Sequence, residues 1–158
     1  MYKKILLCLL CFLLCGCTKD MSLEDQSFEI YKEIKNNILK QTLFDSTDDF
    51  QVSLIYNKIN DEYRYDIIID QPKNVMYDIT AMSYAKEAEE EMCPNIGIFD
   101  YEPFHLKKDY INKKEGFYKG IQLSGTTKIK QNVILYISYY TDKQKINKIE
   151  KYIEVNSK

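Results

Sequence analysis

Several residue types that often carry chemistry are scarce in this 158-residue chain. It has no tryptophan, and its only histidine is His105. Of its five cysteines, four lie within the first seventeen residues, and only Cys93 lies beyond them. A domain with one thiol cannot form an internal disulfide, so its stability must come from a packed core. The absence of tryptophan also disfavours a platform on which sugar rings stack.

A surplus of positive charge is absent as well. The chain carries 22 basic and 24 acidic residues, for a formal net charge of −2, and Arg64 is its only arginine. Binding to nucleic acid normally needs a basic patch. We therefore predict no nucleic-acid partner.

The N-terminal segment combines three features of export signals. Lys3 and Lys4 give a cationic start, residues 5–14 form an apolar run, and the small residue Gly16 precedes Cys17. A spanning helix needs about 20 apolar residues. The run is too short for that, because polar residues begin directly after Cys17.

The sequence Leu14-Cys15-Gly16-Cys17 resembles the end of bacterial lipoprotein signals, in which an aliphatic residue, a small residue and Gly or Ala precede the cysteine. The resemblance covers residues 1–17. It implies that a signal peptide, 1–16, is removed and that the Cys17 thiol receives a diacylglyceryl group, with fatty acyl chains such as palmitate. Two acyl chains give lasting attachment, since each buried methylene contributes about 0.8 kcal/mol. Plain secretion and a short membrane anchor are the alternatives.

The mature chain is predicted to begin with a short tether, 17–21, followed by a helix over 22–42. Without Lys3 and Lys4 it keeps 20 basic residues against 24 acidic ones, a formal charge of −4. Ser22 and Asp25 form a capping pattern at the start of the helix. Apolar residues then recur at helical spacing, namely Leu23, Ile30, Tyr31, Ile34 and Ile38. We expect this apolar face to pack on the rest of the domain; the alternatives are a partner or the lipid surface.

The periodicity then changes to the alternation of β-strands, and residues 48–156 are predicted to form one β-sandwich domain. Its strands are expected near 50–57, 63–70, 75–81, 96–101, 117–123, 133–140 and 145–155. About seven strands joined by local turns indicate a mainly β fold with an N-terminal helix, an antiparallel immunoglobulin-like sandwich. The strand at 133–140 is apolar on both faces, so we expect it to be central, with Leu135 buried. Lys151 lies on the poorly alternating last strand and is expected to be exposed.

Residues with catalytic or metal-binding potential do not form a recognisable motif. His105, Ser124 and Asp100 could be assembled into a triad, but Ser124 lacks the glycine context of a nucleophile elbow. The spacing of His105 and Cys93 matches no zinc pattern. We therefore predict no catalytic residue, no cofactor and no metal site, and interpret Cys93 as a buried apolar residue.

Two acidic groups are interpreted as structural or solvated. Asp45, Asp48 and Asp49 lack the ligand spacing of an EF-hand and are expected to form a capping or hinge loop. An acidic run typical of a solvated surface, or of a contact with a basic partner, comprises Glu87, Glu89, Glu90 and Glu91.

Tyrosine is the residue type most compatible with a recognition face, since its ring is apolar and its hydroxyl polar. Its high β propensity is an equally physical reason for its abundance. The tyrosines of the β region are Tyr63, Tyr65, Tyr77, Tyr84, Tyr101, Tyr110, Tyr118, Tyr136, Tyr139, Tyr140 and Tyr152.

Taken together, these features predict a lipoprotein on the extracytoplasmic face of the cell membrane. Its expected role is non-catalytic binding or assembly, with the membrane as one partner through the lipid and a protein or envelope component as another. An envelope-acting hydrolase, or an accessory or immunity lipoprotein of a mobile or secretion system, is the alternative. A pocket joining His105 to carboxylates would favour the hydrolase, and a flat Tyr-rich face would favour binding.

Overall fold

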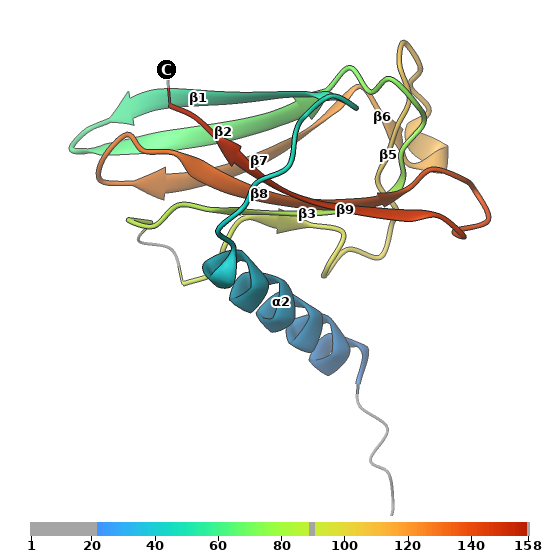
Figure 1. Ribbon diagram of the computed structural model, residues 1–158, viewed down its shortest axis with the longest axis horizontal. Coiled ribbons are helices and arrows are strands. Elements are labelled where there is room, and N and C mark those ends of the chain that lie inside the picture. The colour runs from blue at the N-terminus through green and yellow to red at the C-terminus, as the bar shows by residue number, and fades with distance from the viewer. Residues whose placement is uncertain (1–21, 89–90, 158) are drawn as a thin grey trace, which may run out of the picture.

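The computed structural model describes residues 22–88 and 91–157. Its centre is formed by two antiparallel sheets that face each other (Figure 1). The first sheet has the order β1-β2-β7, with β1 at Gln51–Ile59, β2 at Glu62–Asp70 and β7 at Gly120–Thr127. The second has the order β4-β3-β8-β9, with β4 at Asn95–Ile96, β3 at Tyr77–Tyr84, β8 at Val133–Tyr140 and β9 at Lys148–Val155.

This strand order is that of an immunoglobulin-like sandwich, as predicted. β1, β2 and β7 take the places of strands A, B and E, while β3, β8 and β9 take those of C, F and G. The described residues contain nine strands rather than seven, because the strand expected at 117–123 is divided into two and an additional short strand lies at His105–Leu106. Two of these, β5 (His105–Leu106) and β6 (Phe117–Tyr118), form a parallel ribbon beside a short 3₁₀ helix, η1 (Lys113–Glu115). The strand expected at 96–101 is limited to β4.

The predicted hairpin is present between β1 and β2, and its register runs from Gln51 opposite Asp70 to Ile59 opposite Glu62. A two-residue turn needs a residue that tolerates positive φ. Asn60 supplies it, with φ of 54°. This register places one set of alternating side chains of β1 and β2 in the core and the other set on the outer face.

The main core lies between the two sheets and is built from their inward-facing side chains. Leu135 and Ile137 of β8 are fully buried there, together with Ile67 and Ile69 of β2. On the opposite face of β8, Tyr136 is buried against the helix layer. The prediction that this strand is central and apolar on both faces is therefore confirmed.

Tyr65 reaches across the core because its neighbour in the next strand has no side chain. Tyr65 lies directly opposite Gly125 in the β2–β7 pair. A Cβ at position 125 would lie 2.6 Å from atoms of the Tyr65 ring. The Tyr65 hydroxyl lies 3.3 Å from the Ser83 hydroxyl of the other sheet. Gly125 thus lies within regular strand pairing and makes room for a ring.

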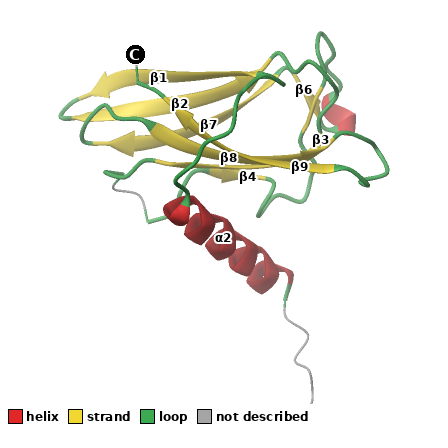
Figure 2. Ribbon diagram, in the orientation of Figure 1, coloured by secondary structure: helices red, strands yellow, loops and turns green. Residues whose placement is uncertain are grey.

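Helix α2 (Leu23–Lys40) packs on the outer face of the second sheet (Figure 2). The Ser22 hydroxyl accepts a hydrogen bond from the Asp25 backbone N–H at 3.1 Å, which confirms the predicted N-cap. The predicted packing of the helix on its own domain is also confirmed, through Tyr31, Ile34 and Ile38. Leu23 and Ile30, however, belong to the predicted apolar face and are exposed.

The segment 41–50 connects α2 to β1 and is fastened to the edge strand β9. Asp45 donates its N–H to the Tyr152 carbonyl at 2.7 Å and accepts the Tyr152 N–H at 2.8 Å. Lys151 donates to the Ser46 carbonyl at 3.2 Å and pairs with the Asp49 carboxylate. The expectation that Lys151 is exposed is wrong: only 16% of its side chain is accessible, because the connecting segment covers it.

Candidate binding surfaces

The predicted anchor, Cys17, lies outside the described residues, as does the signal segment before it. Lipid attachment therefore stays a prediction. Over 22–88 and 91–157, no helix combines the length and apolar character needed to cross a membrane.

The three residues of the imagined triad are not brought together. His105 Nδ1 accepts the backbone N–H of Asp78 at 2.9 Å. Ser124 donates its hydroxyl to Asp66 at 2.6 Å, and Asp100 accepts a backbone N–H from its own loop at 2.7 Å. Each side chain is thus committed to a different partner, on a different part of the fold.

His105 does, however, line a cavity that also contains carboxylates. This His105 pocket has a volume of about 570 Å³ and includes Asp78 and Glu115. The imidazole packs against the rings of Tyr77 and Phe117, with centroid distances of 5.4 and 5.0 Å. The Asp78 carboxylate is paired with Lys145 at 2.8 Å, and no serine, threonine or cysteine is found among the residues that line the pocket. The lining of the pocket therefore does not include the hydroxyl or thiol nucleophile of a Ser-His-Asp or Cys-His triad.

Cys93 is partly buried, and its backbone N–H donates to the Tyr31 hydroxyl at 2.7 Å. Burial raises the pKa of that hydroxyl to about 12. In the described part of the chain, no group of three or more His, Cys, Asp or Glu side chains is placed to hold a metal ion.

The aspartates of the connecting segment have separate structural partners rather than a shared ligand. Asp45 holds the backbone of β9, Asp48 accepts from the Ser46 hydroxyl at 2.9 Å, and Asp49 pairs with Lys151. The hydrogen bond from Lys151 keeps the pKa of Asp49 below its usual value. Of the acidic run, Glu89 and Glu90 lie outside the described residues, while the main-chain carbonyl of Glu87 accepts the Thr127 hydroxyl at 3.1 Å.

The tyrosines do not gather on one face. Tyr65, Tyr136 and Tyr139 are buried in two different packing layers, and burial raises the pKa of Tyr139 to about 12. Tyr101 is almost fully exposed on the helix side of the molecule. The main reason for the abundance of tyrosine is therefore packing within a β fold, not a single recognition surface.

The outer face of the first sheet carries a network of polar side chains and is a further candidate surface. We call it the Arg64 face. Its central positions, read from the strand registers, are Ser53, Ile55, Asn57, Arg64, Asp66, Ile68, Gln122, Ser124 and Thr126. At these nine positions the only charged residues are one arginine and one aspartate, which neutralise each other, while Glu62 and Asp70 lie on the same face at the two ends of β2. Helix α2 lies on the opposite side of the sandwich and leaves this face open (Figure 1).

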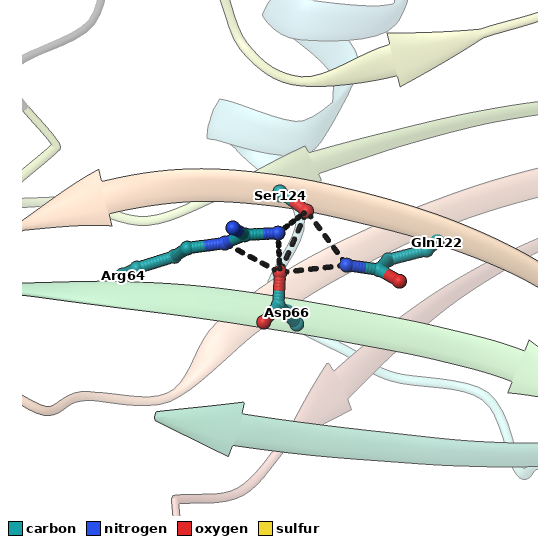
Figure 3. Close-up of polar contacts among 4 residues, drawn as sticks. All are labelled: Arg64, Asp66, Gln122 and Ser124. Atoms are coloured by element: carbon teal, nitrogen blue, oxygen red, sulfur yellow. Dashed lines mark hydrogen bonds and ion pairs between the residues drawn. The ribbon is translucent and has the colours of Figure 1, made fainter. Parts of the chain in front are cut away.

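A network centred on Asp66 organises the Arg64 face (Figure 3). One oxygen of Asp66 accepts from Arg64 Nε at 3.0 Å, from Gln122 Nε2 at 2.9 Å and from the Ser124 hydroxyl at 2.6 Å. Arg64 Nη2 lies 3.0 Å from the same oxygen and donates to the Ser124 hydroxyl at 3.2 Å. Three side chains on two strands thus converge on one carboxylate.

The network keeps Asp66 ionised although it is largely covered, with 8% of the residue exposed. Burial alone would raise the pKa of its carboxyl. The hydrogen bonds from Ser124, Gln122 and Arg64 outweigh burial, so the pKa lies below its usual value. The Arg64 side chain remains 46% exposed, so the carboxylate orients a guanidinium that stays accessible from outside.

The sequence held one signal of this site, the presence of a single arginine. Its significance could not be seen without the register, which places Arg64, Asp66 and Ser124 on one face of two neighbouring strands.

Comparison with known proteins identifies no relative: no family model, curated protein or solved structure matches the chain.

Proposed function

We propose that this protein is a lipid-anchored lipoprotein of the extracytoplasmic membrane face, and that its β-sandwich binds a partner protein through the Arg64 face. The observation that carries the binding role is the centre of this sheet face, where one arginine is held in place by Asp66 and the surrounding side chains are uncharged. Depletion of charge and enrichment of arginine distinguish the centres of protein interfaces from ordinary surface.

The anchoring part of the proposal is supported by the sequence of the N-terminus. The cationic start, the apolar run over 5–14 and the residues Gly16 and Cys17 fit a lipoprotein signal. If the chain is cut before Cys17, five residues connect the lipidated end to Leu23, where helix α2 begins.

The layered arrangement supports the division of roles between the two sides. The helix layer, which begins close to the expected anchor, covers the second sheet, and the Arg64 face lies on the other side of the sandwich (Figure 1). A domain tethered at the start of α2 would therefore be able to present the Arg64 face to a partner in front of the membrane.

Preorganisation supports Arg64 as the central contact. An arginine has five N–H donors, and the bonds to Asp66 and Ser124 use only those on Nε and Nη2. Because the side chain is already held, less conformational entropy is lost when a partner's acceptor binds the remaining donors. The chemistry fits a carboxylate or carbonyl oxygen on the partner, surrounded by small polar and aliphatic groups.

The competing hydrolase hypothesis rests on the His105 pocket, which joins a histidine to carboxylates as that hypothesis requires, whereas the described tyrosines do not form the flat face that would favour binding. That pocket supplies an imidazole and two carboxylates, but the Asp78 carboxylate is paired with Lys145 and His105 is oriented by a backbone N–H. Triad chemistry requires a base hydrogen-bonded to both a nucleophile and an orienting acid, and this geometry does not provide it.

Photo-crosslinking in intact cells tests the binding proposal. A crosslinking amino acid at Ile55, on the Arg64 face, should give one discrete adduct with the lipidated full-length protein. The matched control is the same amino acid at Ile146, an exposed residue in the β8–β9 loop. Arg64→Glu should abolish the Ile55 adduct and leave membrane attachment unchanged. Equal adducts from both positions, or an Ile55 adduct that survives Arg64→Glu, would exclude the Arg64 face as the binding surface.

A further inference from the structure

An apolar patch lies around the first turns of α2. We call it the helix-start patch, and it consists of Leu23 and Ile30 of α2 with Phe99 and Tyr101 of the loop that follows β4. Leu23 is 75% exposed and Tyr101 is 98% exposed. The four side chains line a hollow of about 570 Å³ between the helix and the loop.

The helix-start patch is not needed by the core. Helix α2 buries a different set of side chains, Tyr31, Ile34 and Ile38, against the second sheet. The Phe99 ring packs against the Tyr31 ring, at a centroid distance of 6.0 Å. Part of the Phe99 side chain stays accessible. Large apolar side chains clustered in this way usually mark a contact surface.

The short segment between Cys17 and Leu23 limits how far the patch can lie from the lipid anchor. Five residues lie between Cys17 and Leu23, and the fully extended chain from Cys17 to Leu23 spans about 20 Å at most. If Cys17 carries the lipid, Leu23 at the edge of the patch is therefore held within that distance of the bilayer. A tether this short gives the patch a very high effective concentration at the bilayer surface.

We propose that the helix-start patch rests in the membrane interface, so that the domain lies on the lipid surface rather than swinging freely on its tether. This inference rests on the anchoring part of the proposed function. The residue types fit the interface, since tyrosine is enriched at the headgroup level and leucine, isoleucine and phenylalanine insert just below it.

The charges beside the patch specify the kind of lipid. Glu24 and Asp100 line the same hollow, and no lysine or arginine is among the residues that line it. Anionic headgroups attract basic segments and would repel these carboxylates. The contact is therefore made by apolar burial and is favoured by zwitterionic lipid.

The absence of tryptophan from the chain allows a clean test. Tyr101→Trp introduces a single indole at the patch, and Ile59→Trp introduces one at the exposed end of the β1–β2 hairpin as the matched control. Each lipidated full-length variant is reconstituted in phosphatidylcholine vesicles whose acyl chains carry bromine. The Tyr101→Trp indole should lose most of its fluorescence and shift to the blue, whereas the Ile59→Trp indole should change little. Adding Leu23→Asp to Tyr101→Trp should restore most of the emission.

The outcomes separate this inference from the anchoring proposal. If the protein does not float with the vesicles or carries no acyl group, the anchoring proposal fails. If it floats but the two indoles are quenched equally, the helix-start patch does not touch the membrane. A blue shift at position 101 without quenching by bromine would also overturn the inference, because protein rather than lipid would then cover the patch.

Discussion

At the scale of single residues, the Arg64 face depends on one carboxylate. Asp66 is where the donors of Arg64, Gln122 and Ser124 meet. Each of these residue types is common on protein surfaces, and the sequence alone does not show that these four side chains meet. Their convergence depends on strand register, in which Asp66 stands opposite Ser124. A shift by one residue would turn every side chain of the strand to the other face.

The depressed pKa of Asp66 predicts a specific loss of stability in acid. Because the folded-state pKa lies below the unfolded value of about 3.9, the stabilisation is present above that value and is lost as the pH falls through the folded-state pKa. Asp66→Asn should lower the free energy of unfolding at neutral pH by about 1–3 kcal/mol. It should also flatten the decline in unfolding free energy below about pH 4. Urea melts at a series of pH values measure both, and an unchanged acid slope in Asp66→Asn would contradict the role given to the network.

At the scale of elements, periodicity was sufficient to locate the helix, the hairpin and the central strand β8. It was not sufficient for Lys151, because the residues that cover this side chain lie about one hundred positions earlier in the chain. Asp45, Ser46 and Asp49 fasten the 41–50 segment to β9, and no local pattern in β9 reveals that contact. Helical spacing also did not predict that Leu23 and Ile30 are exposed. It identifies an apolar stripe along the helix, but the extent of the contact between α2 and the second sheet decides which residues of that stripe are covered.

Strands β8 and β9 of the second sheet should respond differently to side-chain truncation. Leu135 has no accessible surface, so Leu135→Ala should cost about 2–5 kcal/mol through lost burial and an unfilled cavity. Lys151→Ala removes a partly exposed ion pair and one hydrogen bond and should cost about 0.5–1.5 kcal/mol. Urea unfolding of the full chain compares them directly. Equal costs would mean that the burial of β8 or the fastening of the 41–50 segment is wrongly described.

At the scale of the whole molecule, the fold class followed from alternation and turn spacing, whereas the functional surfaces did not. The tyrosines that seemed suited to recognition are spread over the core and several faces, and the two surfaces that stand out are defined by the layers of the fold. Figure 2 shows the first sheet, whose outer face is the Arg64 face, on one side of the sandwich and α2 on the other. The helix-start patch lies beside α2. Such an arrangement suits a domain held to a membrane on one side and open to a partner on the other.

The central claim is that Cys17 is the lipidated first residue of the mature protein, and intact-mass analysis of the protein purified from cell membranes tests it most directly. The account predicts a chain that starts at Cys17 and carries the added mass of a diacylglyceryl group, with Cys17→Ser giving an uncut precursor without lipid. A mature chain that retains residues 1–16, or a Cys17→Ser protein that is still lipidated, would contradict it.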